Sequence, residues 1–501
     1  MRATVRLTGG YLTEYARRPV NLALLVLVPL VFVILAAGSL TDFASIVGGV
    51  ADPGQLAAPT AGWAAAFLAG VAGFFHVLGS RDTDRRLANA GMGAWRVTFA
   101  RLVSGLGLAL LAAAAAIVAL AIRTGLPDPT RTIVGTVLTA VIYLGIGIAI
   151  GAVVRNEVNG SLIVIFIWML DVFLGPAMAG GTVALNRVFP SHFVTLYVLN
   201  KPSGYAGPLG DLGWALVWTF GALIVATLIF ASATATRRKL TRGVGAPGSV
   251  RGRVRAGLRY GLRDNRRNVA LWVLLVVLPV FFISLSFYIT PDDPAPVELV
   301  IRGITQIKVL SMINVHGAIM VPITIAFLAG LTGMFVVQGS LQADARLALA
   351  GFRPREILAS RLGVIALAGL LTTVVSLAIT AIDFAPESWL WFAVGNGLVA
   401  ATYGMVGVVV GALFGRVGGL YLMFLLPFID VGIAQNIMFS AAPPAWGAAL
   451  PARGAVQVLI DGAFTPTFDR FGGLLLAVGW LIVLTAVAAE IVRRIAEPKR
   501  A

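Results

Sequence analysis

The sequence contains no cysteine and only three histidines, and charged residues make up 12% of its 501 positions. The absence of cysteine excludes disulfide bonds, thiolate metal sites and cysteine nucleophiles. The three histidines, His76, His192 and His316, leave little material for a metal centre. Ordinary soluble domains carry about 25% charged residues, so this low charge content argues against a water-soluble enzyme and against a disordered chain.

Several motifs of catalysis and nucleotide binding are also missing. The chain has no G-x-x-x-x-G-K-[ST] segment, no H-E-x-x-H and no G-x-S-x-G. Only four of its 38 basic residues are lysines, and none lies in a phosphate-binding context. We therefore expect a chain that is not an enzyme and that binds no metal or cofactor of its own.

Apolar residues, by contrast, are abundant. They make up 58% of the chain, and the mean hydropathy is +0.92. A membrane-spanning helix needs about 20 mainly apolar residues, and twelve segments meet this requirement. They lie near 20–40, 60–79, 97–122, 132–154, 158–178, 212–236, 269–289, 317–338, 360–382, 389–414, 417–438 and 471–492. The sequence thus predicts an all-α polytopic membrane protein.

The formal charge of +16 reflects membrane topology in this interpretation. With the N-terminus on the cytoplasmic side, 30 of the 38 basic residues fall on that side. This bias is what the positive-inside rule requires, and it predicts that both termini are cytoplasmic. Because the basic residues punctuate apolar runs, we expect contact with anionic lipids and no binding of nucleic acid.

An internal repeat relates the two halves of the chain. Residues 79–102 and 339–362 align at a constant offset of 260 with ten identities in 24 positions. The identical pairs are Gly79/Gly339, Ser80/Ser340, Asp84/Asp344, Arg86/Arg346, Leu87/Leu347, Ala88/Ala348, Ala90/Ala350, Gly91/Gly351, Arg101/Arg361 and Leu102/Leu362. The same offset maps Gly147 and Gly151 onto Gly407 and Gly411.

The repeat predicts a domain organisation. Residues 1–240 and 250–501 form two six-span halves, joined by a cytoplasmic linker at 241–249. Each half has an even number of spans, so both have the same orientation and are parallel repeats related by an axis along the membrane normal.

A basic segment precedes the first span of each half. The residues expected at the membrane interface are Arg17, Arg18, Arg255, Arg259 and Arg263. Their spacing beside apolar positions favours a short amphipathic helix that lies on the inner surface. The alternative is a plain positive flank without a helix.

The repeated charged segment follows spans 2 and 8 and is predicted to be cytoplasmic. Its occurrence in both halves suggests that something docks there twice. The alternative is a packed loop in which Asp84 and Arg86 satisfy each other or neighbouring helix ends.

The fifth span of each half contains one acid, Asp171 or Asp430. An ionisable group deep in a membrane is costly and is a candidate for the translocation path. A structural, hydrogen-bonded role is the alternative. After each of these spans comes a long outer connection, 179–211 or 439–470, whose composition fits short re-entrant or surface helices.

Together these features resemble the permeases of type-2 ATP-binding-cassette exporters, over nearly the whole chain. That family has an amphipathic elbow helix before its first span, a cytoplasmic coupling helix between spans 2 and 3 and re-entrant helices between spans 5 and 6. The Glu-x-Gly-Thr core common in the family's coupling segment is absent from both copies here. The residues that occupy the coupling position are Arg81, Asp84, Arg86, Leu87, Gly91, Asp344, Arg346, Leu347 and Gly351.

The fused form is similar to drug-exporter permeases of high-GC bacteria. The resemblance implies a permease subunit in the cytoplasmic membrane that exports a lipophilic substrate such as a drug, antibiotic or lipid. Two copies of a separate cytosolic P-loop ATPase would bind the coupling segments, and ATP and Mg²⁺ would reside on that partner.

Three other classes compete with this interpretation. A proton-coupled secondary transporter of the major-facilitator type also has two parallel six-span halves, and Asp171 and Asp430 would then carry protons. A lipid scramblase or an assembly scaffold would need no nucleotide. An integral-membrane enzyme is disfavoured because no acid–base or metal constellation is visible.

Overall fold

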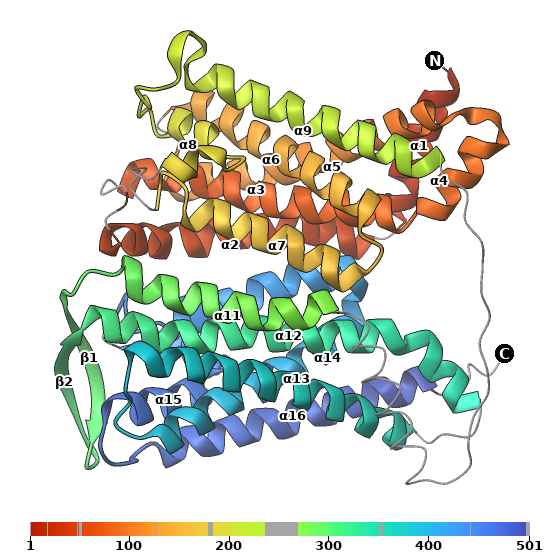
Figure 1. The fold of residues 1–501 in the computed structure, drawn as a ribbon. Helices are drawn as coiled ribbons and strands as arrows, with labels where there is room; N and C mark the ends of the chain where they lie inside the picture. Colours follow the sequence, from red (N-terminus) through yellow and green to blue (C-terminus); the bar gives the residue numbers. More distant parts are fainter. Residues whose placement is uncertain are drawn as a thin grey trace. The chain divides into compact units, whose positions relative to one another are not determined.

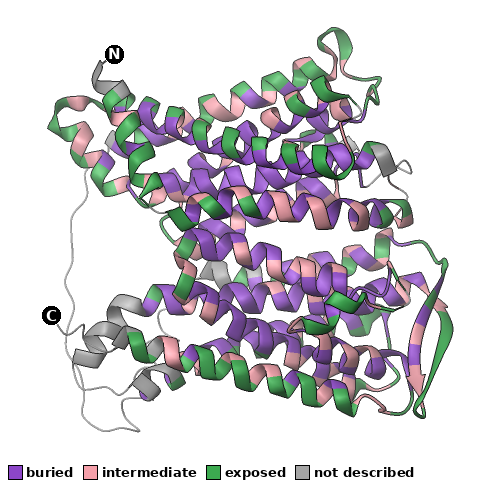
Figure 2. Cartoon of the chain, turned by 180° about the vertical axis from the view of Figure 1, so that it is seen from behind, coloured by how far each residue is buried: buried purple, intermediate pink, exposed green. Residues whose placement is uncertain are grey.

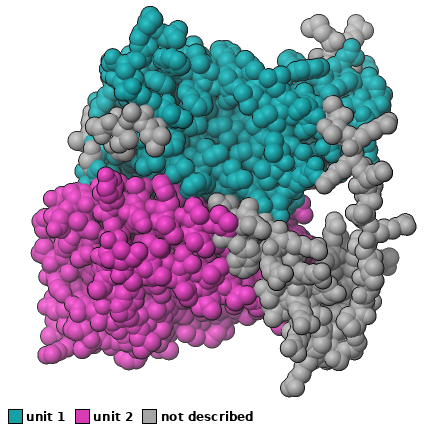
Figure 3. Space-filling view, in the orientation of Figure 1, with its two compact units in different colours: residues 1–242 teal, residues 243–501 magenta. Residues whose placement is uncertain are grey.

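The computed structural model describes residues 2–17, 19–47, 49, 53–126, 128–178, 184–235, 269–349, 354–440 and 442–496. The contacts within the chain divide it into two compact units, residues 1–242 and 243–501, which Figure 3 colours separately. Each unit is largely helical (Figure 1). The predicted linker at 241–249 and the basic residues Arg18, Arg255, Arg259 and Arg263 lie outside the described residues.

Unit 1 consists of helices in its described part. In chain order they are α1 (Arg2–Ala16), α2 (Pro19–Ile46), α3 (Pro53–Leu78), α4 (Arg81–Leu87), the π-helical turn η1 (Ala88–Met92), α5 (Ala94–Arg123), α6 (Pro129–Val153), α7 (Glu157–Phe173), η2 (Ala184–Val188), α8 (His192–Val198), η3 (Gly207–Leu209) and α9 (Gly210–Ala235). Side-chain caps fix the N-termini of two of these helices. The carboxylate of Asp128 caps α6 ahead of Pro129, and the side chain of Asn156 caps α7.

The core of unit 1 is organised around α3. Its apolar window is 89% buried, whereas that of α9 is only 28% buried. Figure 2 shows this gradient from buried central helices to exposed outer ones. Helix α5 leaves a stripe of large apolar residues exposed along one face, which fits a lipid-facing surface. The stripe comprises Trp95, Phe99, Val103, Leu110, Val118 and Ile122.

Small residues set the spacing between the central helices of unit 1. A Cβ added at Gly147 of α6 would collide with the backbone of Gly70 in α3. Gly151 meets the carbonyl of Phe74 in the same way. Backbones in such direct contact require glycine at the crossing point.

Unit 2 contains the second set of helices and one hairpin. In chain order its elements are α11 (Val269–Ile289), β1 (Pro294–Ile301), β2 (Ile304–Ser311), α12 (Met312–Leu349), α13 (Pro354–Asp383), α14 (Trp389–Pro427), the π-helical turn η4 (Phe428–Ala434), η5 (Ala445–Ala449), α15 (Arg453–Phe464) and α16 (Phe471–Ala496). The central crossing repeats that of unit 1. Gly407 of α14 abuts Gly330 of α12, and Gly411 abuts Met334.

Nine helices in the described residues are long and apolar enough to cross a membrane. The chain is therefore a helical, polytopic membrane protein. Two of the twelve expected spans are not among the nine, because α7 has 17 residues and the apolar stretch of α11 covers 275–289. Two others form one continuous stretch, Trp389–Ala434, which bends at Gly415, where φ is 70°.

The expectation of purely helical structure was wrong at residues 294–311. There β1 and β2 pair in antiparallel register, with Val297 opposite Lys308 and Ile301 opposite Ile304. Arg302 and Gly303 both have positive φ, 53° and 75°, as a two-residue hairpin turn requires. Alternating β-branched residues on both sides of Arg302-Gly303 are the sequence signal that predicts this hairpin.

Candidate functional site

The charged segment after α3 forms α4, which lies with α1 at one end of unit 1, while α8 lies at the other end (Figure 1). Its centre is the carboxylate of Asp84, which is fully buried. Arg101 of α5 donates to it twice, from Nε at 2.8 Å and from Nη2 at 3.0 Å. The hydroxyl of Tyr11 in α1 donates a third hydrogen bond at 2.9 Å. A carboxylate buried at this depth needs such paired partners to remain charged.

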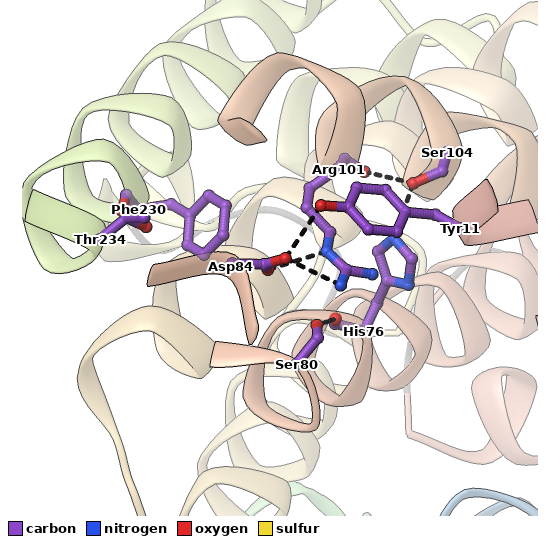
Figure 4. Close-up of polar contacts among 8 residues, drawn as sticks. All are labelled: Tyr11, His76, Ser80, Asp84, Arg101, Ser104, Phe230 and Thr234. Atoms are coloured by element: carbon purple, nitrogen blue, oxygen red, sulfur yellow. Dashed lines mark hydrogen bonds and ion pairs between the residues drawn. The ribbon is translucent and has the colours of Figure 1, made fainter. Parts of the chain in front are cut away.

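Tyr11 joins helix α1 to this ion pair. The guanidinium of Arg101 lies over its ring, 3.4 Å from the centroid, in a cation–π contact. Burial, and next the charge of Asp84, raises the pKa of the Tyr11 hydroxyl above its ordinary value. The hydroxyl therefore stays protonated and remains a hydrogen-bond donor. Residues from α1, α4 and α5 are thereby locked into one cluster (Figure 4).

A second layer of hydrogen bonds supports Arg101. Ser104 donates to the carbonyl of Arg101 at 3.0 Å and lies 2.7 Å from Nε2 of His76. Because the Ser104 proton is used in this bond, its oxygen accepts from Nε2 of His76. Ser80 donates back to the carbonyl of His76 at 2.6 Å. Figure 4 places Phe230 and Thr234 of α9 beside the cluster.

Two arginines of α4 reach the ends of other helices. Arg81 donates to the carbonyl of Ala152, in the last turn of α6. Arg85 donates through Nε and Nη2 to the carbonyl of Ala233, in the last turn of α9, at 3.1 and 2.9 Å. Cations are favourable at helix C-termini because the unpaired carbonyls carry partial negative charge. Helix α4 is thus held by α1, α5, α6 and α9 together.

The opposite side of α4 is open. Asp82 and Arg86 are exposed, and so is Gly91 in the following turn. Gly91 has φ of 100°, a conformation that suits glycine. Leu87 is half-buried between the two sides. Of the residues expected to contact a partner, Arg86 and Gly91 are accessible, while Asp84 faces the interior and Arg81 caps α6.

Asp84 does not pair with Arg86, which was one form of the packed-loop alternative. Asp84 pairs with Arg101, which is 17 residues away along the chain. Arg101 and Tyr11 were not among the predicted site residues. One signal pointed to Arg101, since Asp84 and Arg101 both recur in the repeat as Asp344 and Arg361.

The second copy of the charged segment takes a different course. In unit 1 the chain breaks at Gly79 and Ser80, so that α4 is a separate helix. In unit 2, α12 runs on without a break to Leu349 and includes Asp344, Arg346 and Leu347. The side chains of these three residues, and Gly351 as a whole, lie outside what the structure describes.

The two acids of the fifth spans occupy matching sites at the other end of each unit. Asp171 is 1% exposed; it accepts from the hydroxyl of Tyr143 at 2.7 Å and from the backbone N–H of Ser191 at 3.1 Å. Asp430 is also 1% exposed; it accepts from Tyr403 at 2.9 Å and from the N–H of Ala452 at 2.9 Å.

Each acid therefore links a tyrosine on a long helix to the start of a short helix in the same unit. Ser191 directly precedes α8, and Ala452 directly precedes α15. This arrangement favours the structural alternative for both residues, because an anchored carboxylate with two or more donors holds backbone in place.

His192 begins α8 and contacts the aromatic side chains nearby. Its Nε2 lies 2.6 Å from the hydroxyl of Tyr205, and Arg187 stacks on that ring at 3.7 Å. Burial lowers the pKa of His192 below its ordinary value, with the charge of Asp211 acting in the opposite direction. The residue serves as a neutral hydrogen-bonding partner in an aromatic cluster.

Among the described residues, no group of three or more His, Asp or Glu side chains could hold a metal ion. No protein-family model and no curated protein sequence matches the chain. The site is therefore interpreted from its own geometry.

Proposed function

We propose that this chain is the permease subunit of an ATP-driven exporter of the ATP-binding-cassette type. Its twelve spans would form two parallel six-span halves in a prokaryotic cytoplasmic membrane, with both termini in the cytoplasm. The substrate would be a lipophilic small molecule, and two copies of a cytosolic P-loop ATPase would supply the energy by binding ATP and Mg²⁺. The interpretation as a non-enzymatic subunit follows from the same proposal.

One observation carries the proposal: one side of α4 is bonded to neighbouring helices, and the opposite side is exposed. Its inner side is fixed to four helices by the Asp84–Arg101 pair, the Tyr11 hydrogen bond and the arginine caps. Its outer side exposes Asp82 and Arg86 to a partner. A rigid element that is bonded inward and open outward transmits a displacement from a bound partner to the spanning helices.

The matched contacts in the two units support the duplicated architecture. Tyr143 and Tyr403 lie 260 residues apart, as do the crossing glycines Gly147 and Gly407, and they make equivalent contacts. Splitting the long helix at Gly415 and adding α7 and α11 to the nine apolar helices yields twelve spans.

The charge distribution supports the orientation. Arg81, Arg85 and Arg86 lie at the α4 end of unit 1, whereas Asp171 anchors the outer helix at the opposite end. Basic residues are retained on the cytoplasmic side of a membrane protein. In the proposed orientation α4 is therefore cytoplasmic and accessible to a cytosolic ATPase.

The test is purification of the full-length chain from its native host, followed by an ATPase assay on the eluate. We expect a co-purifying P-loop ATPase, and we expect Arg86→Glu combined with Arg346→Glu to release it. Lys308→Glu is the matched control, because Lys308 is an exposed cation on the hairpin, at the other end of α12 from Arg346.

Three results would decide between the classes. Loss of the ATPase in the double variant but not in the control would support the exporter. A chain that purifies alone and transports on a proton gradient would support the secondary transporter instead. ATPase recovery that is equal in all variants would remove Arg86 and Arg346 from the interface.

A further inference from the structure

Strand β1 of the hairpin in unit 2 borders a small hollow of about 70 Å³ that has no assigned role. Its walls are β1 at Glu298–Val300, helix α15 and Arg470, which directly precedes α16. Figure 1 shows the hairpin beside α15 at this end of the unit. The lining mixes apolar residues with a few polar groups, as small-molecule sites do.

A chain of hydrogen bonds holds the hairpin over the hollow. The backbone N–H of Arg302, in the hairpin turn, donates to Asp469 at 2.8 Å. The N–H of Asp469 in turn donates to Asp461 of α15 at 2.8 Å, and the Thr465 hydroxyl donates to the other oxygen of Asp461 at 3.0 Å. The N–H of Asp469 thus binds one oxygen of Asp461, and the Thr465 hydroxyl shares its single proton between the other oxygen and two backbone carbonyls.

Arg453 is positioned in the hollow by neutral groups. Its Nη1 donates to the side-chain oxygen of Gln435 at 3.1 Å. With its amide oriented to suit both residues, Gln457 accepts from Nε and Nη2 at 3.3 and 3.2 Å. Neutral amides therefore hold the guanidinium in a fixed orientation, and none of these hydrogen bonds is to a carboxylate.

The charges of Arg470 and Glu298 both act on Arg453. Burial, and next the charge of Arg470, lowers the pKa of Arg453, while Glu298 acts in the opposite direction. Among the described residues, neither Arg453 nor Arg470 forms an ion pair with a carboxylate. Two arginines and two acids thus line the hollow with no net charge.

These features define a ligand by its chemistry. Two guanidinium groups that lack carboxylate partners favour a phosphate, which presents oxygens to both. Glu298, whose carboxylate accepts no hydrogen bond among the described groups, favours a cationic group a short distance away. A neutral set of charges disfavours polyanions and polycations and suits a molecule that carries one charge of each sign.

We propose that this hollow binds a zwitterion of the phosphoethanolamine type, with its phosphate at Arg453 and Arg470 and its ammonium at Glu298. The same chemistry is available in the headgroup of a phospholipid and in a free solute. The site does not depend on the proposed transport function, since it is built within unit 2 alone.

The test uses the purified full-length chain and two probes. O-phosphoethanolamine is titrated calorimetrically into the protein in detergent. Nanodiscs that contain phosphatidylethanolamine or phosphatidylglycerol are compared by native mass spectrometry of the lipids that remain bound. We expect Arg470→Gln to weaken binding by about tenfold or more. Lys308→Gln, which removes an exposed cation outside the lining, should leave binding unchanged.

Glu298→Gln sharpens the test. It should reduce the preference for O-phosphoethanolamine over glycerol 3-phosphate, which lacks the amine, because only the amine contacts Glu298. Arg470 and Glu298 make no side-chain hydrogen bond among the described residues, so both variants should fold even if Arg453→Gln does not.

Each outcome decides the proposal. Calorimetric binding that Arg470→Gln weakens supports a free solute, and selective retention of phosphatidylethanolamine that the same variant abolishes supports a lipid headgroup. Binding of neither probe, or binding equal in Arg470→Gln and Lys308→Gln, overturns the site.

Discussion

Asp171 in unit 1 and Asp430 in unit 2 each accept hydrogen bonds from a tyrosine and from the backbone N–H that precedes a short helix, whereas the opposite ends of the units differ. In unit 1, His76 and Ser104 join the polar cluster around Asp84. At an offset of 260 these two positions are Val336 and Val364, which belong to an apolar region of unit 2.

This difference distinguishes packing contacts that both units share from polar contacts that are seen in unit 1. The tyrosine–aspartate anchors and the glycine crossings are alike in both units, so both units use the same contacts to pack their central helices. The cluster at α4 relies in unit 1 on directional, charged bonds, which fix one orientation. The valines of unit 2 pack without such directionality. At these two positions, therefore, unit 1 uses polar contacts where unit 2 uses apolar packing.

The largest expected effect is at Arg101. Arg101→Met leaves the Asp84 carboxylate buried without its main partner, and we expect it to lower the free energy of unfolding by about 3–5 kcal/mol. Arg86→Met, at an exposed position on the same helix, should change it by no more than about 0.5 kcal/mol. Thermal unfolding of both variants in detergent measures the difference. Similar small losses in the two would show that the Asp84 cluster adds little stability.

A second prediction concerns the glycine crossings. Gly147→Ala and Gly407→Ala introduce a Cβ into the backbone of the facing helix, and each should cost about 1–3 kcal/mol through overpacking. Gly221→Ala and Gly397→Ala are the matched controls, because an added Cβ meets nothing within 4 Å at either position. Equal losses of stability in Gly147→Ala and Gly407→Ala would show that the two units pack in the same way at this crossing. A loss in only one variant would show that they do not.

The acid anchors are expected to couple to their tyrosines. In a double-mutant cycle of Asp171→Asn and Tyr143→Phe, we expect a coupling energy of about 0.5–3 kcal/mol, with a similar value for Asp430→Asn and Tyr403→Phe. The effect should appear in thermal stability, with transport per folded molecule unchanged. If Asp171→Asn instead alters transport at unchanged stability, the acid acts in the translocation path.

The smallest expected effect is a pH dependence at His192. Burial lowers the pKa of His192 in the folded chain below 6.5, its ordinary value. As the pH falls below about 6.5, the unfolded chain therefore gains a proton that the folded chain does not, and stability decreases. The decrease continues until the pH reaches the folded-state pKa.

The measurement is unfolding between about pH 7 and pH 5, in the wild type and in His192→Gln. The variant should lose part of this dependence, and an unchanged slope would contradict the assignment. The corresponding residue after the second anchor is Arg453, which follows Ala452 as His192 follows Ser191 and does not titrate in this range.

The helices themselves were largely predictable. Long apolar runs predict α5, α6 and α9 to within three residues at each end, because a chain in lipid must satisfy its backbone groups within each helix. Helix α2 ends six residues later than predicted, and α3 begins seven residues earlier. The hairpin at 294–311 was missed because the apolar runs on both sides dominated the pattern.

The candidate site was predictable only in outline. The repeat correctly singled out the segment around Asp84 as one with a specific arrangement. It could not tell which of its charges face inward, because a helix of seven residues, α4, is too short for its periodicity to fix a face. The donors to Asp84 come from α1 and α5, which lie 73 and 17 residues away.

The sequence by itself determined that this chain is a polytopic membrane protein of helices, because hydropathy is a local property that acts over about 20 residues at a time. Only the tertiary structure decided that Asp84 is an interior anchor while Arg86 is exposed, and that Asp171 and Asp430 hold the starts of α8 and α15. The physical reason is that a buried charge is stabilised by the groups which the fold brings to it, and these groups come from distant parts of the chain.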